Sequence, residues 1–103
     1  MNDIKLMDLD GYARECHQIA KDHGWWDELR SIPELLCLIH SEVSEALEGY
    51  RNHDAQNFRE EIADILIRVF DLAGWMKLDL DATVQEKMEK NKTRPHKHGG
   101  KKL

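Results

Sequence analysis

The chain has 103 residues and a formal net charge of -5, and 41% of its residues are hydrophobic, which predicts one folded domain and excludes a disordered chain. Residues 1–86 hold 8 basic and 19 acidic residues, whereas residues 87–103 hold 7 basic residues and one acid. An acidic body with a basic tail argues against a plain nucleic-acid binder. Because no apolar run reaches membrane-spanning length and no signal-peptide pattern opens the chain, we expect a cytoplasmic protein.

Apolar residues recur at steps of three and four along the chain, which predicts helices and no strands. The first predicted helix runs from about Asp8 to His23. Gly24 is placed to end it, since glycine accepts the left-handed conformation found after helix ends. A loop containing Trp25 and Trp26 follows.

The second predicted helix opens on a capping signal. Ser31 caps the first turn, Pro33 suits that turn, and Glu34 completes a capping box. The helix is expected to end near Asn52. One apolar stripe along it is expected to face the core, and its members are Leu36, Ile39, Val43, Ala46, Leu47 and Tyr50.

The third predicted helix begins after Asp54 and reaches Met76, and a fourth, capped by Asp79 or Asp81, ends before Pro95. The third helix has a second apolar stripe that a single chain would cover poorly, formed by Leu66, Phe70 and Ala73. Amphipathic helices with short loops predict an all-α, four-helix-type bundle that is completed by oligomerisation.

We expect one helical domain over residues 1–95, followed by a basic C-terminal tail at residues 96–103. The two cysteines, Cys16 and Cys37, lie inside helical patterns without a CxxC spacing. This placement favours small core residues in a reducing compartment over a disulfide or a metal site.

Two neighbouring helices each carry a pair of acids three residues apart, beside an apolar stripe. Glu42 and Glu45 form the first pair, and Glu61 and Asp64 form the second. If the helices pack antiparallel, the four carboxylates can converge at one end of the interface. Neighbouring carboxylates raise one another's pKa, and a hard divalent cation such as Mg²⁺ or Mn²⁺ removes that penalty. Ordinary solvated acids on helix flanks are the other interpretation.

Two other kinds of metal site do not fit the sequence. A di-iron bundle needs a glutamate three residues before a histidine on two helices, and none of the six histidines has one. A zinc site needs converging cysteines or histidines, and none is spaced for it.

The segments SEVSEALEGYR and EEIADILIRVFDLA resemble the MazG-like all-α nucleoside triphosphate pyrophosphohydrolases. In that family an E-x-x-E pair and an E-x-x-D pair hold Mg²⁺, and Glu42, Glu45, Glu61 and Asp64 match those positions. The flanks HQIAKDHGWW and KMEKNKTRPHKHGGKKL are similar to those of small stand-alone or phage-encoded members, so the resemblance covers nearly the whole chain. Ser41 stands where many relatives have a second glutamate, which leaves both Glu42 and Glu45 as candidates for the general base.

The resemblance also implies contacts with the substrate. Lys87, Asn91 and Arg94 share a face on and just past the fourth helix, where related residues contact the triphosphate. A lysine-rich last turn, favoured by the helix dipole, is the simpler interpretation, but it explains Asn91 and Arg94 less well.

Aromatic residues after the first helix suggest a base-binding pocket. Trp25 and Trp26 could stack on a nucleobase, and His17 and Trp26 fall where pocket residues occur in relatives. At least one tryptophan is expected to anchor the loop to the core, and a single histidine on a helix is more often exposed or satisfied by a neighbour. We take stacking by Trp26 and anchoring by Trp25 as the case to test, and the swapped roles stay open because adjacent loop residues have no periodicity.

Together these features predict hydrolysis of (deoxy)nucleoside triphosphates to the monophosphate and pyrophosphate, dependent on Mg²⁺ or Mn²⁺. Glu42 or Glu45 would orient or deprotonate the attacking water. The resemblance implies a homodimer or homotetramer, and we expect neither a membrane nor a nucleic-acid partner. Two other interpretations stay open: a non-catalytic helical interaction module with a basic tail, and a basic-tailed regulator that touches nucleic acid.

Overall fold

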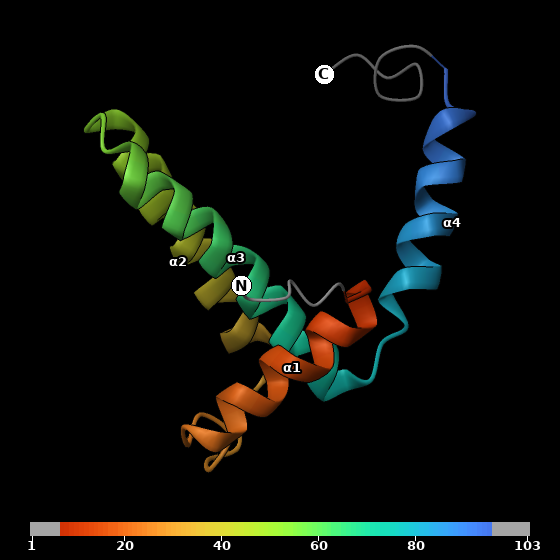
Figure 1. Ribbon diagram of the computed structural model, residues 1–103, viewed down its shortest axis with the longest axis horizontal. Helices are drawn as coiled ribbons and strands as arrows, with labels where there is room; N and C mark the ends of the chain where they lie inside the picture. Colours follow the sequence, from red (N-terminus) through yellow and green to blue (C-terminus); the bar gives the residue numbers. More distant parts are fainter. Residues whose placement is uncertain (1–6, 96–103) are drawn as a thin grey trace, which may run out of the picture.

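The computed structural model describes residues 7–95, which form four α-helices (Figure 1). Their bounds are Leu9–Asp22 for α1, Ile32–Arg51 for α2, Ala55–Met76 for α3 and Leu80–Lys92 for α4. No strand occurs within residues 7–95, so the predicted all-α class is confirmed. The basic tail at residues 96–103 lies outside the described residues. None of the helices in the described part is long and apolar enough to cross a membrane.

Three of the helices begin at side-chain caps, and two of these caps, Ser31 and Asp54, lie where the sequence placed helix starts. The side chains of Asp8, Ser31 and Asp54 each accept a hydrogen bond from the backbone N–H three residues later. These bonds satisfy N–H groups that a first helical turn cannot pair internally, and they fix where α1, α2 and α3 start. Gly24 has a positive φ of 83°, in keeping with its predicted place after the end of α1.

The first turns of α1 and α4 cap one another. Oδ1 of Asp10 on α1 accepts from the backbone N–H of Leu80 at 2.7 Å. In return, Asp81 on α4 accepts from the backbone N–H groups of Leu9 and Asp10, at 3.0 and 3.2 Å. Burial alone would raise the pKa of Asp81, but these backbone hydrogen bonds hold it below its usual range. The two aspartates therefore form the junction that fixes where α4 leaves α1.

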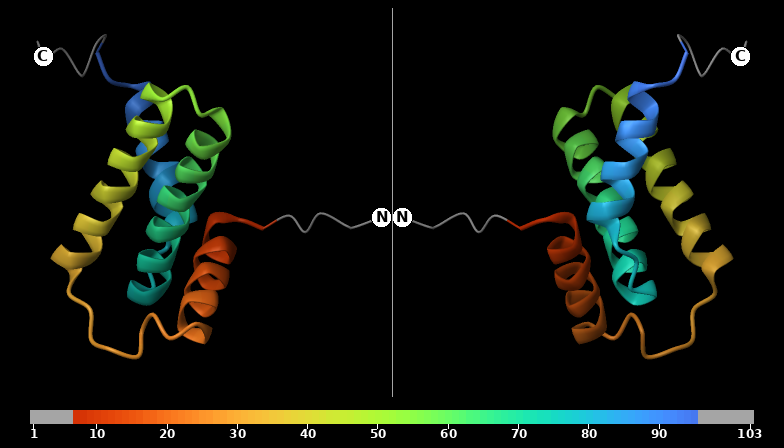
Figure 2. Two further views of the ribbon diagram at one scale, coloured as in Figure 1. Left: turned by 90° about the vertical axis from the view of Figure 1, so that its left-hand side faces the viewer. Right: turned by 90° about the vertical axis from the view of Figure 1, so that its right-hand side faces the viewer.

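Helix α3 is the centre of the packing, because both α1 and α2 lie against it, and α2 and α3 run side by side as an antiparallel pair (Figures 1 and 2). The crossing of α1 over α3 is close at Gly74, where a Cβ atom would meet the backbone carbonyl oxygen of Ala13. Most of the buried apolar positions in the described residues are alanines, namely Ala13, Ala46 and Ala73, with Leu35. Small residues therefore let the backbones approach. Helix α4 contacts α1 and otherwise extends away from α2 and α3 (Figure 1).

Several residues predicted to lie in the core are exposed in the single chain. Tyr50 is 68% exposed and Cys37 is also exposed, so both predictions were wrong. Half-exposed members of the same α2 stripe are Leu36, Val43 and Leu47. The stripe is broader than the surface that α3 alone can cover, and α4 does not lie over it (Figure 1).

The second apolar stripe on α3 differs from its prediction in the other direction, because it is better covered than expected for a single chain. Ala73 is only 2% exposed, and Phe70 stacks on Tyr12 of α1 with ring centroids 5.5 Å apart. Helix α1 thus covers most of the stripe that a single chain was expected to leave bare, and Leu66 is the member that stays half exposed. Completion of the bundle by oligomerisation stays a prediction.

Candidate metal centre

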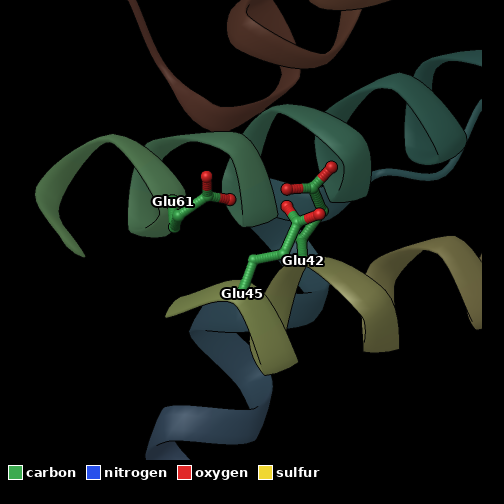
Figure 3. A group of neighbouring side chains, drawn as sticks. All are labelled: Glu42, Glu45 and Glu61. Carbon is green, nitrogen blue, oxygen red and sulfur yellow. The ribbon is translucent and has the colours of Figure 1, made fainter. Parts of the chain in front are cut away.

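Helices α2 and α3 bring three of the four predicted carboxylates together. Glu42 and Glu45 project from α2, and Glu61 projects from the facing part of α3 (Figure 3). One carboxylate oxygen from each lies within 4.8 Å of the others. This spacing allows the three side chains to act as ligands of a single cation.

Asp64 lies one turn along α3 from Glu61 and is not part of this group of three. Its side chain is exposed and, together with Glu42, lines the pocket beside the group. The predicted convergence therefore brings together three carboxylates, with the fourth next to them.

Glu61 has the least favourable environment for a carboxylate charge in the group. Its Oε2 atom is buried and has no hydrogen-bond partner. Hydrogen bonding with Glu42, burial, and the nearby carboxyl of Glu45 raise the pKa of Glu61 to about 7. Glu61 therefore keeps a proton close to neutral pH, and a divalent cation would have to displace that proton.

Glu42 differs from Glu61, because Arg68, a residue of α3, favours its ionised form. Nε of Arg68 donates to Oε1 of Glu42 at 2.8 Å, which is a direct ion pair. Burial alone would raise the pKa of Glu42, but the hydrogen bond from Arg68 and those shared with Glu61 and Glu45 hold it below its usual range. Sequence reasoning missed Arg68, although its position four residues after Asp64 places it on the same strip of α3.

We expect the affinity for a divalent cation to rise with pH because Glu61 must lose its proton. With a pKa of about 7, roughly a tenth of Glu61 is ionised at pH 6 and roughly nine tenths at pH 8. Mn²⁺ should therefore bind about tenfold more weakly at pH 6 than at pH 8 in calorimetric titrations. Glu61→Gln should bind weakly at both values, and a wild-type affinity that does not change with pH would contradict the assignment.

A pocket of about 400 Å³ lies beside the carboxylates. Its lining combines apolar groups, including Trp25 and Ile67, with the charged groups of Glu42, Asp64, Arg68 and Asp71. Its volume falls within the usual range for small-molecule sites. The arrangement places an apolar, partly aromatic surface next to a candidate cation site.

Of the two arrangements left open for the tryptophans, the structure has the one with Trp25 beside the pocket and Trp26 bonded to Asp71. The indole Nε1 of Trp26 donates to Oδ1 of buried Asp71 at 2.9 Å, and its ring stacks on Trp75 with centroids 5.1 Å apart. His17 contacts the same carboxylate oxygen through Nδ1, also at 2.9 Å. Trp26 and His17 therefore belong to a half-buried cluster centred on Asp71, a residue that sequence reasoning missed.

Trp25 is the tryptophan that lines the pocket. The guanidinium carbon of Arg30 lies 4.0 Å from the centroid of its ring, and that of Arg68 lies 5.3 Å away. Nε of Arg30 also donates to the backbone carbonyl of Trp25 at 3.1 Å. These contacts hold the Trp25 ring beside the acids through cation–π attraction and a backbone hydrogen bond.

The predicted phosphate ligands lie far from this arrangement in the single chain. Lys87 and Asn91 are exposed on α4, and Arg94 is exposed just past its end. Because α4 extends away from α2 and α3, none of the three lines the pocket that the described residues form (Figure 1). Their contact with phosphate stays a prediction that needs either a second subunit or a different position of α4.

The fold and the site together define an all-α protein with a candidate cation site between two antiparallel helices. Residues 30–99 match the family model of the MazG nucleotide pyrophosphohydrolase domain, which is more than half of the chain. The chain therefore belongs to this family of nucleotide pyrophosphohydrolases. The matched range contains all the residues predicted to bind metal or phosphate, whereas those predicted to bind the base precede it. Searches of curated proteins and of solved structures gave no match.

Proposed function

We propose that the protein hydrolyses nucleoside triphosphates, including deoxynucleotides, to the monophosphate and pyrophosphate in a Mg²⁺-dependent reaction. The observation that carries the proposal is the group of Glu42, Glu45 and Glu61, which lies on two facing helices beside a pocket of suitable size (Figure 3). Membership of the MazG family supplies the reaction class.

The donor set of the site fits a hard divalent cation. It consists of carboxylate oxygens, which Mg²⁺ and Mn²⁺ prefer, and Oε2 of Glu61 is buried without a partner. We propose that Glu42, Glu45 and Glu61 hold the ion and that Asp64, one turn from Glu61, completes the set. When bound, the ion would offset the charge of the triphosphate and activate water.

The remaining chemistry falls to side chains of the chain. A water attacks the α-phosphorus, the bond from this phosphorus to the bridging oxygen breaks, and pyrophosphate leaves. Glu42 and Glu45 are the candidates for orienting that water or accepting its proton. Because Glu45 is exposed and Glu42 is buried, the carboxylate of Glu45 is the more accessible of the two to water.

We propose that the nucleobase lies in the pocket beside Trp25, and we expect the two tryptophans to respond differently to truncation. Trp25→Ala should weaken nucleotide binding by about 1–3 kcal/mol, the range of base stacking, with a small loss of stability. Trp26→Ala should instead destabilise the fold by about 3 kcal/mol, because its ring packs on Trp75 and its N–H bonds to Asp71.

Nucleotide titrations followed by tryptophan fluorescence, together with thermal unfolding of both variants, separate the two cases. The reverse pattern, with lost affinity in Trp26→Ala and lost stability in Trp25→Ala, would restore the roles predicted from the sequence. If neither variant changes the affinity, the base is bound elsewhere.

We also propose that the enzyme acts in the cytoplasm as a homodimer or homotetramer. Two free cysteines suit a reducing compartment. Half-exposed apolar residues on α2 and α3, among them Val43, Leu47 and Leu66, could pack against another subunit. Light scattering of the purified protein measures the assembly state.

The experiment that tests the function is a panel of common and modified nucleoside triphosphates, incubated with the protein and Mg²⁺, with the products separated by anion-exchange chromatography. Monophosphate and pyrophosphate are expected, and a chelator should abolish their formation. Diphosphate and phosphate would contradict the proposed site of attack. No turnover, with no rise in melting temperature on adding Mg²⁺ and nucleotide, would favour the non-catalytic interaction module.

A further inference from the structure

Arg68 links the group of carboxylates to the pocket. Its Nε donates to Glu42 at 2.8 Å, and its guanidinium lies 5.3 Å from the Trp25 ring centroid. The Arg68 side chain is 32% exposed and lines the pocket. The guanidinium is therefore held between a carboxylate and an indole ring, with part of its surface open to a ligand.

The acidic lining of the pocket makes the guanidinium of Arg68 important for binding an anionic substrate. Among the described residues that line it, Arg68 is the only cation, and it stands beside the acids Glu42, Asp64 and Asp71. A triphosphate would meet strong repulsion there unless positive charge offset the acids. The recorded hydrogen bond to Glu42 uses Nε, and a guanidinium carries four further N–H groups on its terminal nitrogens. Those N–H groups match the bidentate geometry of phosphate oxygens.

We infer that Arg68 is a triphosphate ligand, which the metal-free protein holds in place on Glu42. The inference rests on the proposed function and extends it to a residue outside the acidic motif. Without metal, Arg68 offsets the charge of Glu42. A cation bound by the acids would offset the charge of Glu42, and the guanidinium would then be available to phosphate oxygens in the pocket.

A merely structural Arg68 would behave differently in a metal titration. If Arg68 served only to position Glu42 as a ligand, its removal would weaken both metal binding and triphosphate binding. If Arg68 is a cation that competes for Glu42, its removal strengthens metal binding and weakens triphosphate binding. The two roles thus predict opposite signs for the change in metal affinity.

The test uses Arg68→Met, Arg68→Lys and the control Arg59→Met, which changes an exposed arginine elsewhere on α3. Calorimetry at pH 8 measures the binding of Mn²⁺ alone and of magnesium tripolyphosphate, a probe that has the triphosphate but no base. Arg68→Met should bind Mn²⁺ at least about fivefold more tightly, because a unit charge a few ångströms away in water costs about 1 kcal/mol for each charge of the ion. It should bind magnesium tripolyphosphate at least about tenfold more weakly, the effect of losing charge-assisted hydrogen bonds.

Arg68→Lys keeps the charge and loses the planar fork, so it should match the wild type for Mn²⁺ and lie between wild type and Arg68→Met for tripolyphosphate. Arg59→Met should match the wild type for both. Weaker Mn²⁺ binding by Arg68→Met, or an unchanged tripolyphosphate affinity, would overturn the inference. If Arg68→Met does not fold, wild-type tripolyphosphate affinity in Arg68→Lys overturns it. Neither titration needs turnover, so failure of the proposed hydrolysis would appear separately, as an inactive wild-type protein.

Discussion

Glu45→Gln and Asp64→Asn should each abolish nucleotide hydrolysis while leaving the helices folded. Each substitution removes one proposed anionic ligand and changes the size of the side chain little, so the loss should appear in catalysis. A metal supplies several kcal/mol of transition-state stabilisation, and losing about 4 kcal/mol corresponds to roughly a 10³-fold fall in rate. Because Glu45→Gln relieves repulsion within the group, the metal-free variant should be at least as stable as the wild type.

The matched control is Glu48→Gln, an exposed glutamate on α2 that is not part of the carboxylate group. It should retain wild-type activity and Mn²⁺ affinity. Circular dichroism establishes that all three variants are folded before rates are compared. Near-wild-type rates in Glu45→Gln or Asp64→Asn would show that the corresponding carboxylate is not a metal ligand.

Gly74→Ala should destabilise the protein by about 3 kcal/mol, although alanine favours helix by roughly 1 kcal/mol over glycine. The added Cβ would meet the carbonyl oxygen of Ala13 and lie 2.7 Å from Cβ of His17. Both atoms are fixed to the backbone of α1, so the clash can be relieved only by moving α1 away from α3. At about 4–8 °C per kcal/mol for a domain of this size, the melting temperature should fall by more than 10 °C.

Gly11→Ala is the matched control, since it makes the same change in α1. There the nearest atoms to a new Cβ are Oδ1 of the capping Asp8, at 3.0 Å, and Cβ of Met7, at 3.2 Å, and a shift of a few tenths of an ångström in either relieves the contact. Its effect should stay within about 1 kcal/mol of the wild type in thermal or chemical unfolding. Equal stability of Gly74→Ala and Gly11→Ala would mean that α1 and α3 do not cross as closely as the structure has them.

The parts of the fold that follow from short-range signals could be predicted from the sequence. Ser31 and Asp54 act on N–H groups three residues away, so the starts of α2 and α3 follow from local chemistry. The carboxylate group was also predictable, because acids three apart share a face and a short turn makes consecutive helices antiparallel. Both inferences need only spacing along the chain.

The parts that depend on which elements meet could not be predicted. A periodic stripe shows that α2 is amphipathic, but Tyr50 is 68% exposed because, among the described helices, α3 touches its ring through Phe58 and leaves most of it uncovered. Adjacent loop residues have no periodicity, so Trp25 and Trp26 could not be told apart. Arg68 and Asp71 look like ordinary solvated charges on a helix until the crossing of α1, α2 and α3 brings partners to them.

The reciprocal caps of Asp10 and Asp81 hold α4 at its first turn, which acts as a pivot for the rest of the helix. Its principal contacts lie at the first turn, while its 13 residues extend for about 20 Å beyond that pivot. A tilt of about 10° at the pivot would carry the far end through about 3 Å, roughly the length of a hydrogen bond. The positions of Lys87 and Asn91 therefore depend on two carboxylates at the opposite end of the helix. The displacement that a given tilt produces increases with the distance of a residue from that end.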